Sequence, residues 1–246
     1  MRILYLVPGQ MPEQEQKRRE QIAQTFVTNP ATEVRVEAVE RGPLSIESAI
    51  EDYMAVPEIL KKLLGVQKTY DAAIIGCFGD PGLRPARELV EIPVIGPSEA
   101  SVSFASMIGD TFSILTVLDS VVPLMEAQMR EMGADSRCKS IRTLNIPVLE
   151  LATDKERTLQ VMIDLAKQMT REDRPASIIL GCMSEAFLLF DEKMQPSIDV
   201  PIINPAKVCI KTAEMFSSLK MTHSKASYPA PNLEKFYEAG LLRPPL

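Results

Sequence analysis

The two halves of this 246-residue chain repeat one another in order. Residues 74–77 read Ile-Ile-Gly-Cys, and residues 179–182 read Ile-Leu-Gly-Cys. Further on, Ile-Pro-Val-Ile-Gly-Pro at 92–97 corresponds to Val-Pro-Ile-Ile-Asn-Pro at 200–205. A series of strand, Gly-Cys pair, proline-containing apolar strand and proline-started helix rarely arises twice by chance. We therefore interpret the halves as an internal duplication, and two copies are too few for a solenoid.

In both halves, short β-rich apolar runs alternate with longer helical patterns, which is typical of βαβ units and parallel sheets. To complete the overlay, Ile-Leu-Tyr-Leu-Val at 3–7 is matched with Ile-Leu-Thr-Val-Leu at 114–118. Pro57 is expected to kink or split the second predicted helix. Strands are predicted over 3–7, 33–38, 72–77, 94–96, 113–118, 140–145, 177–182 and 202–204. Helices are predicted over 12–26, 45–64, 97–107, 120–132, 153–169 and 205–219.

The predicted fold is α/β, with two pseudosymmetric lobes, each built on a parallel sheet, and a cleft between the lobes. Residues 1–100 and 205–220 are predicted to form the first lobe, through a crossover of the chain, and residues 101–204 the second. Residues 221–246 form a C-terminal tail. Its apolar side chains are expected to pack on the body of the protein or on a partner subunit, so we expect a homo-oligomer.

The composition excludes several classes of function. His223 is the only histidine, and the four cysteines are Cys77, Cys138, Cys182 and Cys209. One histidine makes a His-rich metal site impossible and leaves a Ser-His-Asp triad a single candidate base. A net charge of −6 argues against nucleic acid as a partner, because that partner requires a basic face. No apolar run reaches the length of a membrane span and the first residues lack a signal-peptide pattern, so we expect a cytoplasmic protein, with no membrane partner, whose cysteines are thiols.

Cys77 and Cys182 occupy equivalent places in the duplication, at the carboxyl ends of predicted strands, where open α/β sheets bind ligands. They are therefore expected to face each other across the cleft. A racemase removes a proton from one face of a carbon and returns one to the other, which a thiolate and a thiol on opposite sides accomplish without a metal or an organic cofactor. A following helix N-terminus lowers the pKa of a thiol. Cys209 is interpreted as core and Cys138 as incidental.

The stretch Gly-Cys-Phe-Gly-Asp-Pro-Gly-Leu at 76–83 resembles the first cysteine motif of hydantoin racemases, in the aspartate/glutamate racemase superfamily. Gly-Pro-Leu-Ser-Ile-Glu at 42–47, Gly-Cys at 181–182 and the segment 224–229 resemble further parts of the same family. The similarity covers nearly the whole chain up to about residue 220. It implies that Cys77 and Cys182 are the two acid/base catalysts and that no cofactor takes part.

Two stretches depart from the pattern of that family. Hydantoin racemases usually carry Asn-Pro-Asn-Thr after the first strand, whereas residues 7–10 read Val-Pro-Gly-Gln. Their second cysteine is usually followed by Ala-Gly-Met, whereas residues 183–185 read Met-Ser-Glu. A bulkier and more acidic rim alters which substrate fits the cleft.

Residues at the strand ends and in the following turns are the candidates for contacting substrate. The loop 78–82 is expected to point its amides into the cleft, although the same residues also make an ordinary turn. Glu185 is interpreted as complementing a helix N-terminus, residues 14–20 as a solvated helix face, and His223 as a surface residue. The candidate substrate contacts are Pro8, Phe78, Gly79, Asp80, Ser98, Glu99, Met183, Ser184 and Asn204, of which Ser98, Glu99 and Asn204 are also explained as helix-cap or turn residues.

Together these observations predict a cofactor-independent racemase or epimerase that acts at a carbon next to a carbonyl group. Its small-molecule substrate is expected to be a hydantoin or an amino-acid-like compound. Within the same superfamily, a maleate isomerase or an arylmalonate-type decarboxylase is the alternative. A non-catalytic two-lobe protein that encloses a small anion predicts dispensable thiols. A redox switch predicts a reversible disulfide between Cys77 and Cys182.

Overall fold

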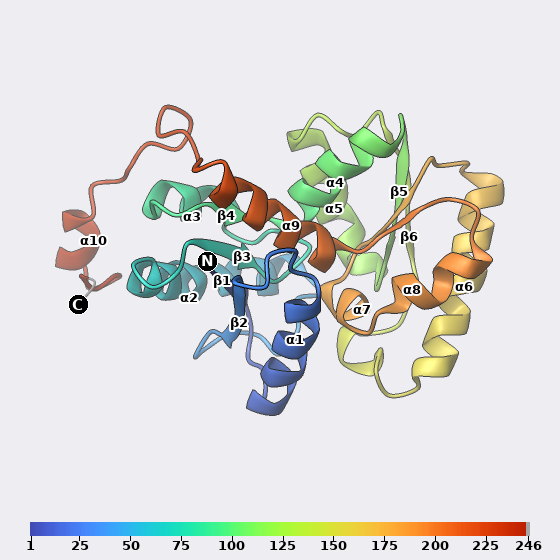
Figure 1. Ribbon diagram of the computed structural model, residues 1–246, viewed down its shortest axis with the longest axis horizontal. Coiled ribbons are helices and arrows are strands. Elements are labelled where there is room, and N and C mark those ends of the chain that lie inside the picture. Colours follow the sequence, from blue (N-terminus) through green and yellow to red (C-terminus); the bar gives the residue numbers. More distant parts are fainter. Residues whose placement is uncertain (245–246) are drawn as a thin grey trace.

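The computed structural model describes residues 1–244 and folds them around two parallel four-stranded sheets (Figure 1). Residues 245–246 of the predicted tail lie outside the described residues. The strands are β1 (Arg2–Val7), β2 (Glu33–Ala38), β3 (Ala72–Ile75), β4 (Val94–Ile95), β5 (Phe112–Thr116), β6 (Cys138–Thr143), β7 (Ile178–Leu180) and β8 (Ile202–Ile203). The helices are α1 (Glu13–Thr25), α2 (Ala49–Val66), α3 (Leu83–Leu89), α4 (Pro97–Ile108), η1 (Asp119–Val121), α5 (Val122–Glu131), η2 (Val148–Glu150), α6 (Lys155–Glu172), α7 (Met183–Phe187), α8 (Phe190–Met194), η3 (Gln195–Ser197), α9 (Pro205–Ser218) and α10 (Glu234–Glu238).

The two sheets repeat each other strand for strand. Their strand orders are β2-β1-β3-β4 and β6-β5-β7-β8, and every neighbouring pair is parallel. The central strands β1, β3, β5 and β7 are buried almost throughout, as expected of parallel strands covered by helices on both faces. The predicted α/β fold with two pseudosymmetric sheets is confirmed.

The overlay of the first strands differs from the prediction. Leu6 pairs with Ile75 where Leu115 pairs with Leu180, so Leu115 takes the place of Leu6. The predicted match of Ile3 with Ile114 is therefore wrong, because Ile114 occupies the position of Tyr5. A slip of two positions leaves every side chain on the same face of the strand, so an apolar run does not reveal it.

Each sheet is covered on both faces, and one helix of each half covers the sheet of the other half. The first sheet packs against α1 and α9 on one face and against α2 and α3 on the other. The second packs against α4 and α5 on one face and α6 and α8 on the other. Thus α4 follows a strand of the first sheet but packs on the second sheet, and α9 follows a strand of the second sheet but packs on the first. The two helices contact each other where the halves meet (Figure 1). The predicted lobe boundaries at residues 100 and 204 stay a prediction.

The helices differ from the sequence prediction at the start of α2 and in several short helices. α2 begins at Ala49 instead of residue 45, because the Glu51 carboxylate reaches back to the Glu47 amide (2.7 Å) and the Ser48 hydroxyl (2.9 Å). α2 also continues through Pro57 without being split. Pro57 is exposed, so the carbonyl that loses its partner is open to water. The short helices α3, α7, α8 and α10 lie outside the predicted helix ranges. None of the helices formed by residues 1–244 is long and apolar enough to span a membrane.

The segment that follows α9 runs back along the edge of the first sheet. The His223 Nε2 atom lies 3.0 Å from the nitrogen and 2.9 Å from the oxygen of Val94, in the edge strand β4. Lys225 donates to backbone carbonyls at the end of α3, including that of Val90 (3.0 Å). This part of the tail packs on the body of the protein. Beyond it, α10 stands away from both sheets in Figure 1, and Leu241 is 60% exposed.

Candidate active site

The two thiols sit at matching ends of the central strands because of the glycines that precede them. A Cβ atom on Gly76 would lie 2.6 Å from Cε1 of Tyr5, and one on Gly181 would lie 2.8 Å from Cγ2 of Ile114. Only glycine lets β3 and β7 end this close to the neighbouring strand. The next residue of the chain, Cys77 or Cys182, then stands at the carboxyl edge of its sheet.

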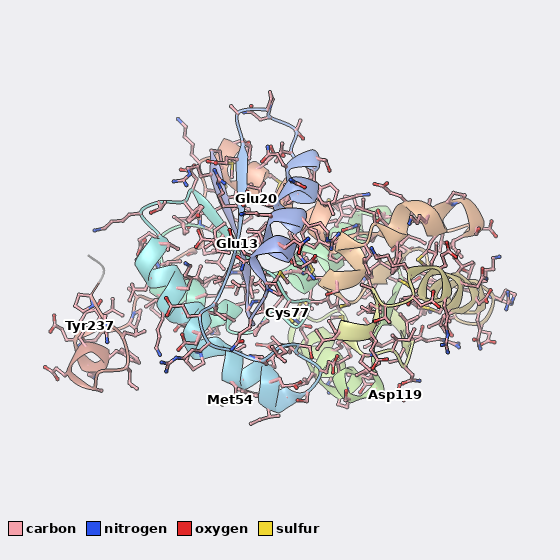
Figure 2. All side chains as sticks on the ribbon, turned by 90° about the horizontal axis from the view of Figure 1, so that it is seen from below. Glu13, Glu20, Met54, Cys77, Asp119 and Tyr237 are labelled. Atoms are coloured by element: carbon pink, nitrogen blue, oxygen red, sulfur yellow. The ribbon has the colours of Figure 1, made fainter. Side chains whose placement is uncertain are left out.

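Both thiols line one cavity of about 1070 Å³ between the two halves. Figure 2 shows Cys77 near the middle of the molecule, between elements of the two sheets. Cys77 is partly exposed and Cys182 is buried, and all four cysteines are free thiols. Within residues 1–244, no three His, Cys, Asp or Glu side chains converge as metal ligands do. The structure brings to this cavity, besides the two thiols, the predicted residues Pro8, Phe78, Gly79, Asp80, Glu99, Met183 and Ser184.

Two predicted substrate contacts do not line the cavity, and the structure assigns them to packing and capping instead. Ser98 is fully buried in the first turn of α4. Asn204 is the N-cap of α9: its side-chain oxygen accepts from the amides of Ala206 (2.9 Å) and Lys207 (3.2 Å). Its side-chain nitrogen donates to the carbonyl of Ala186 (3.0 Å). With both ends of its amide engaged, Asn204 has no free group for a substrate, which corrects the expectation.

Asp80 lines the cavity, but its carboxylate is also engaged. Its two oxygens accept from the backbone amides of Ser98 and Glu99, each at 3.0 Å, and so cap α4. Burial raises the pKa of Asp80 to about 8, against the opposing effect of those two amides. The loop 78–82 is therefore tied to the start of α4, with Gly82 in the left-handed region at φ 69°.

The surroundings of the thiols act in opposite directions on their pKa values. Burial raises the pKa of both, that of Cys182 to about 12. The backbone N–H of Gly79 opposes this at Cys77, and those of Ser184 and Glu185 oppose it at Cys182. The predicted effect of a helix N-terminus is present at Cys182, which precedes α7, whereas Gly79 beside Cys77 lies in a turn before α3. At both thiols burial outweighs the effect of these backbone N–H groups on the pKa.

Three residues of the cavity wall that the sequence does not predict come from α1. Residues 14–20 were interpreted as a solvated helix face, yet Glu15, Arg18 and Arg19 line the cavity. Arg19 is 7% exposed, and its guanidinium donates to the Ser184 hydroxyl (3.0 Å) and to Glu15 (2.9 Å). Arg18 donates to the carbonyl of Phe187 (2.9 Å). Charged pairs three and four residues apart also occur on exposed helices, so the pattern gave no signal of this docking.

Two further wall residues were missed. Asp52 of α2 faces the turn at Gly79, where an added Cβ would lie 2.9 Å from its Oδ1. Burial raises the pKa of Asp52 to about 6. Tyr228 reaches the cavity from the C-terminal segment, and its hydroxyl accepts from Arg87 (3.1 Å). No local pattern could have indicated that the tail supplies a wall residue.

Known proteins with the same architecture are racemases and their relatives. A model of the Asp/Glu/Hydantoin racemase family matches residues 16–213. A hydantoin racemase from Pseudomonas sp. (strain NS671) is 32% identical over 210 residues, which cover 85% of this chain and 84% of that protein. An allantoin racemase structure from Klebsiella pneumoniae matches with a TM-score of 0.86 and 27% identity over 94% of each chain. Arylmalonate decarboxylase shares the fold, with a TM-score of 0.61 and 17% identity over 87% of this chain and 92% of that one.

Two like parallel sheets with one cavity between them define an α/β enzyme of the racemase class, which is a class of isomerases. The chain belongs to the Asp/Glu/Hydantoin racemase family, and the resemblance seen in its cysteine motifs is confirmed.

Proposed function

We propose that this racemase is independent of cofactors and that Cys77 and Cys182 exchange protons with opposite faces of a carbon next to a carbonyl group. One observation carries the proposal. The two thiols follow β3 and β7, equivalent strands of two equivalent sheets, and both line the same cavity. A substrate between the sheets then has one thiol on each side.

The reaction requires one thiol to start as a thiolate. That thiolate removes the proton from the carbon, and the electrons of the C–H bond move into the neighbouring carbonyl to form an enolate. The opposite thiol then gives its proton to the other face of the carbon. The backbone amides beside each sulfur stabilise whichever thiol is charged at that moment. After one turnover the two cysteines have exchanged protonation states.

A cyclic ureide, either a 5-substituted hydantoin or allantoin, is the substrate class that we infer. Relatives named as hydantoin and allantoin racemases support this choice. Such rings carry an acidic C–H next to a carbonyl group, as the proposed chemistry requires. Their N–H groups match the acceptors of the wall, among them the Asp52 carboxylate. An amino-acid-like compound is the second substrate class to test.

The experiment follows single enantiomers of 5-substituted hydantoins, allantoin and amino acids in deuterated water, by chiral chromatography and by proton exchange. We expect Cys77→Ser and Cys182→Ser each to lower racemisation at least about 10³-fold, since each removes one general acid/base. One variant is expected to keep exchange from a single face. Cys138→Ser, at a thiol outside the cavity, is the matched control and should racemise normally.

Normal racemisation by both cavity variants would contradict the two-thiol mechanism. Release of CO₂ from an arylmalonate without racemisation of any ureide would instead favour a decarboxylase.

A further inference from the structure

The acidic residue three positions after each cysteine has a different environment in the two copies of the fold. Asp80 follows Cys77, and Glu185 follows Cys182. Asp80 uses both carboxylate oxygens to cap α4, because the residue before that helix, Gly96, has no side chain. At the equivalent place before α9 stands Asn204, which caps its own helix.

Glu185 is therefore not needed to cap α9, and it lies instead in the first turn of its own helix, α7. Its side chain is 0% exposed, and neither carboxyl oxygen has a hydrogen-bond partner among residues 1–244. Burying an ionised carboxylate without a partner costs a large amount of free energy, so the Glu185 carboxyl must hold a proton or share one with a neighbour. Burial raises the pKa of Glu185 well above its usual range, against the opposing effect of the backbone N–H of Cys182.

The neighbour available for sharing is Cys182, the N-cap of the helix α7 that carries Glu185. Glu185 is the third residue of α7, a position from which a side chain reaches back toward the N-cap residue, here Cys182. The charge of Glu185 raises the pKa of the Cys182 thiol further, after the effect of burial. Arg19 of α1 is the cation that faces Cys182, but its guanidinium is bound to Glu15 and Ser184.

Two further cations on elements packed around α7 are already engaged. Lys207 of α9 is paired with Asp191 and Glu192 of α8. The Arg18 guanidinium of α1 is bound to Glu15 and to a backbone carbonyl of α7. On β1, Tyr5 packs edge-on against Phe187 at 5.1 Å, and its hydroxyl is a further buried group without a partner. Cys209 of α9 is a buried thiol on the same side of the first sheet as Tyr5.

We propose that Glu185 is the proton partner of Cys182, a positioning residue that acts through this thiol. Cys77 has no such partner at the equivalent position, because Asp80 caps α4. The S–H bond of Cys182 breaks, the proton moves to a carboxyl oxygen of Glu185, and the sulfur keeps the electron pair. The pair holds one proton and one negative charge before and after the step, so no other reactant is needed. The neutral carboxyl then donates a hydrogen bond to the thiolate. The role in turnover rests on the proposed function of Cys182 as a base.

The test is site-resolved alkylation by iodoacetamide, measured by peptide mass spectrometry between pH 5 and pH 11 on the full chain. A shared proton makes the Cys182 alkylation rate rise in two steps with pH. Glu185→Gln leaves only the thiol to titrate, so the two steps are expected to become a single step, measured against Cys77 in the same sample. Glu192→Gln, a solvent-facing carboxyl on α8, is the matched control.

Three outcomes would overturn the proposal. A single-step profile for Cys182 in the wild-type chain does so without any variant, which covers the case that Glu185→Gln fails to fold. If the pH profile of Cys182 alkylation is unchanged in Glu185→Gln, Glu185 contributes only to packing. Faster alkylation of Cys182 in that variant would mean that Glu185 only repels the thiolate. Alkylation needs no turnover, so loss of the two-thiol mechanism is recognised separately, by normal racemisation in Cys182→Ser.

Discussion

At the scale of the residue, the repeated Gly-Cys pair combines a packing requirement with a chemical one. The N–H of Gly76 donates to the Leu6 carbonyl at 2.7 Å, and that of Gly181 donates to the Leu115 carbonyl at 2.6 Å. These bonds hold the strand end against its neighbour, where a side chain has no room. The cysteine that follows is thereby placed at the cavity in both halves.

This packing predicts the effect of adding one methyl group. Gly76→Ala and Gly181→Ala are each expected to lower the free energy of unfolding by about 1–3 kcal/mol, the usual cost of overpacking a tight site. Gly65→Ala is the matched control, because a Cβ there meets nothing within 4 Å and the position is helical. The free energy of unfolding of that variant should increase by roughly 0.5–1 kcal/mol, because alanine has a higher helix propensity than glycine. Urea unfolding measures all three, and equal stabilities would contradict the close approach.

At the scale of the element, the starts of α4 and α9 show how a duplicated design diverges. Asn204 caps α9 from its own N-cap position, whereas α4 is capped by Asp80 from a loop far away in sequence. The sequence is consistent with Asn204 as a turn residue and as a substrate contact, and local features do not choose between these two roles. The structure chooses the cap because Asn204 is buried behind the cavity wall.

Asn204→Ala therefore tests capping against substrate binding. We expect the free energy of unfolding to fall by about 2 kcal/mol, since the change leaves buried amides and a carbonyl without partners. The KM for the racemised substrate should stay within about twofold, because no atom of Asn204 lines the cavity. Steady-state kinetics and urea unfolding of the same preparation separate the two roles. A large rise in KM at unchanged stability would restore Asn204 as a substrate contact.

The C-terminal segment gives a pH-dependent prediction. Burial, with a further contribution from Arg87, lowers the pKa of His223 to about 4. The unfolded chain takes up a proton near the usual pKa of about 6.5, so it binds more protons than the folded chain between these values, and stability falls as the pH drops from about 6.5 to about 4. Because His223 is only half-buried, we expect a loss of about 1 kcal/mol.

His223→Gln is the variant that isolates this effect. Its amide keeps a polar contact at β4 and does not titrate, so its stability should depend less on pH over the same interval. Urea unfolding at pH 7 and at pH 5 measures the difference between the two proteins. A wild-type chain and a variant with parallel pH dependence would show that His223 is not the group responsible.

At the scale of the whole molecule, contacts between the halves close the cavity on the side of α2. The Glu47 carboxylate accepts from the Val148 amide at 2.6 Å, and the Glu47 carbonyl accepts from the Ser120 hydroxyl at 2.6 Å. Gln128 donates across the same gap to the carbonyl of Gly79 at 3.2 Å. These bonds hold the first half against the second over the lining residues.

Removing the Glu47 side chain should loosen that closure. For Glu47→Ala we expect the KM to rise about fivefold to tenfold, in line with the net loss of one hydrogen bond worth about 1–1.5 kcal/mol. Glu47→Gln keeps an acceptor for the Val148 amide, so its KM should rise less. Steady-state kinetics with the racemised substrate measures both, and equal KM values in wild type and alanine variant would contradict a role in closure.

The sequence by itself determined the duplication, the positions of the strands along the chain and the two Gly-Cys positions. Apolar runs, glycine turns and proline-started helices are local features, so consecutive residues encode them directly. It did not reveal that α4 and α9 exchange sheets, that Arg19 is buried against Ser184, or that Ile114 falls in the place of Tyr5. These facts depend on contacts between residues far apart in the chain. For the same reason, only the tertiary structure decided that Asp80 is bound to a helix while Glu185, its counterpart, remains free beside a thiol.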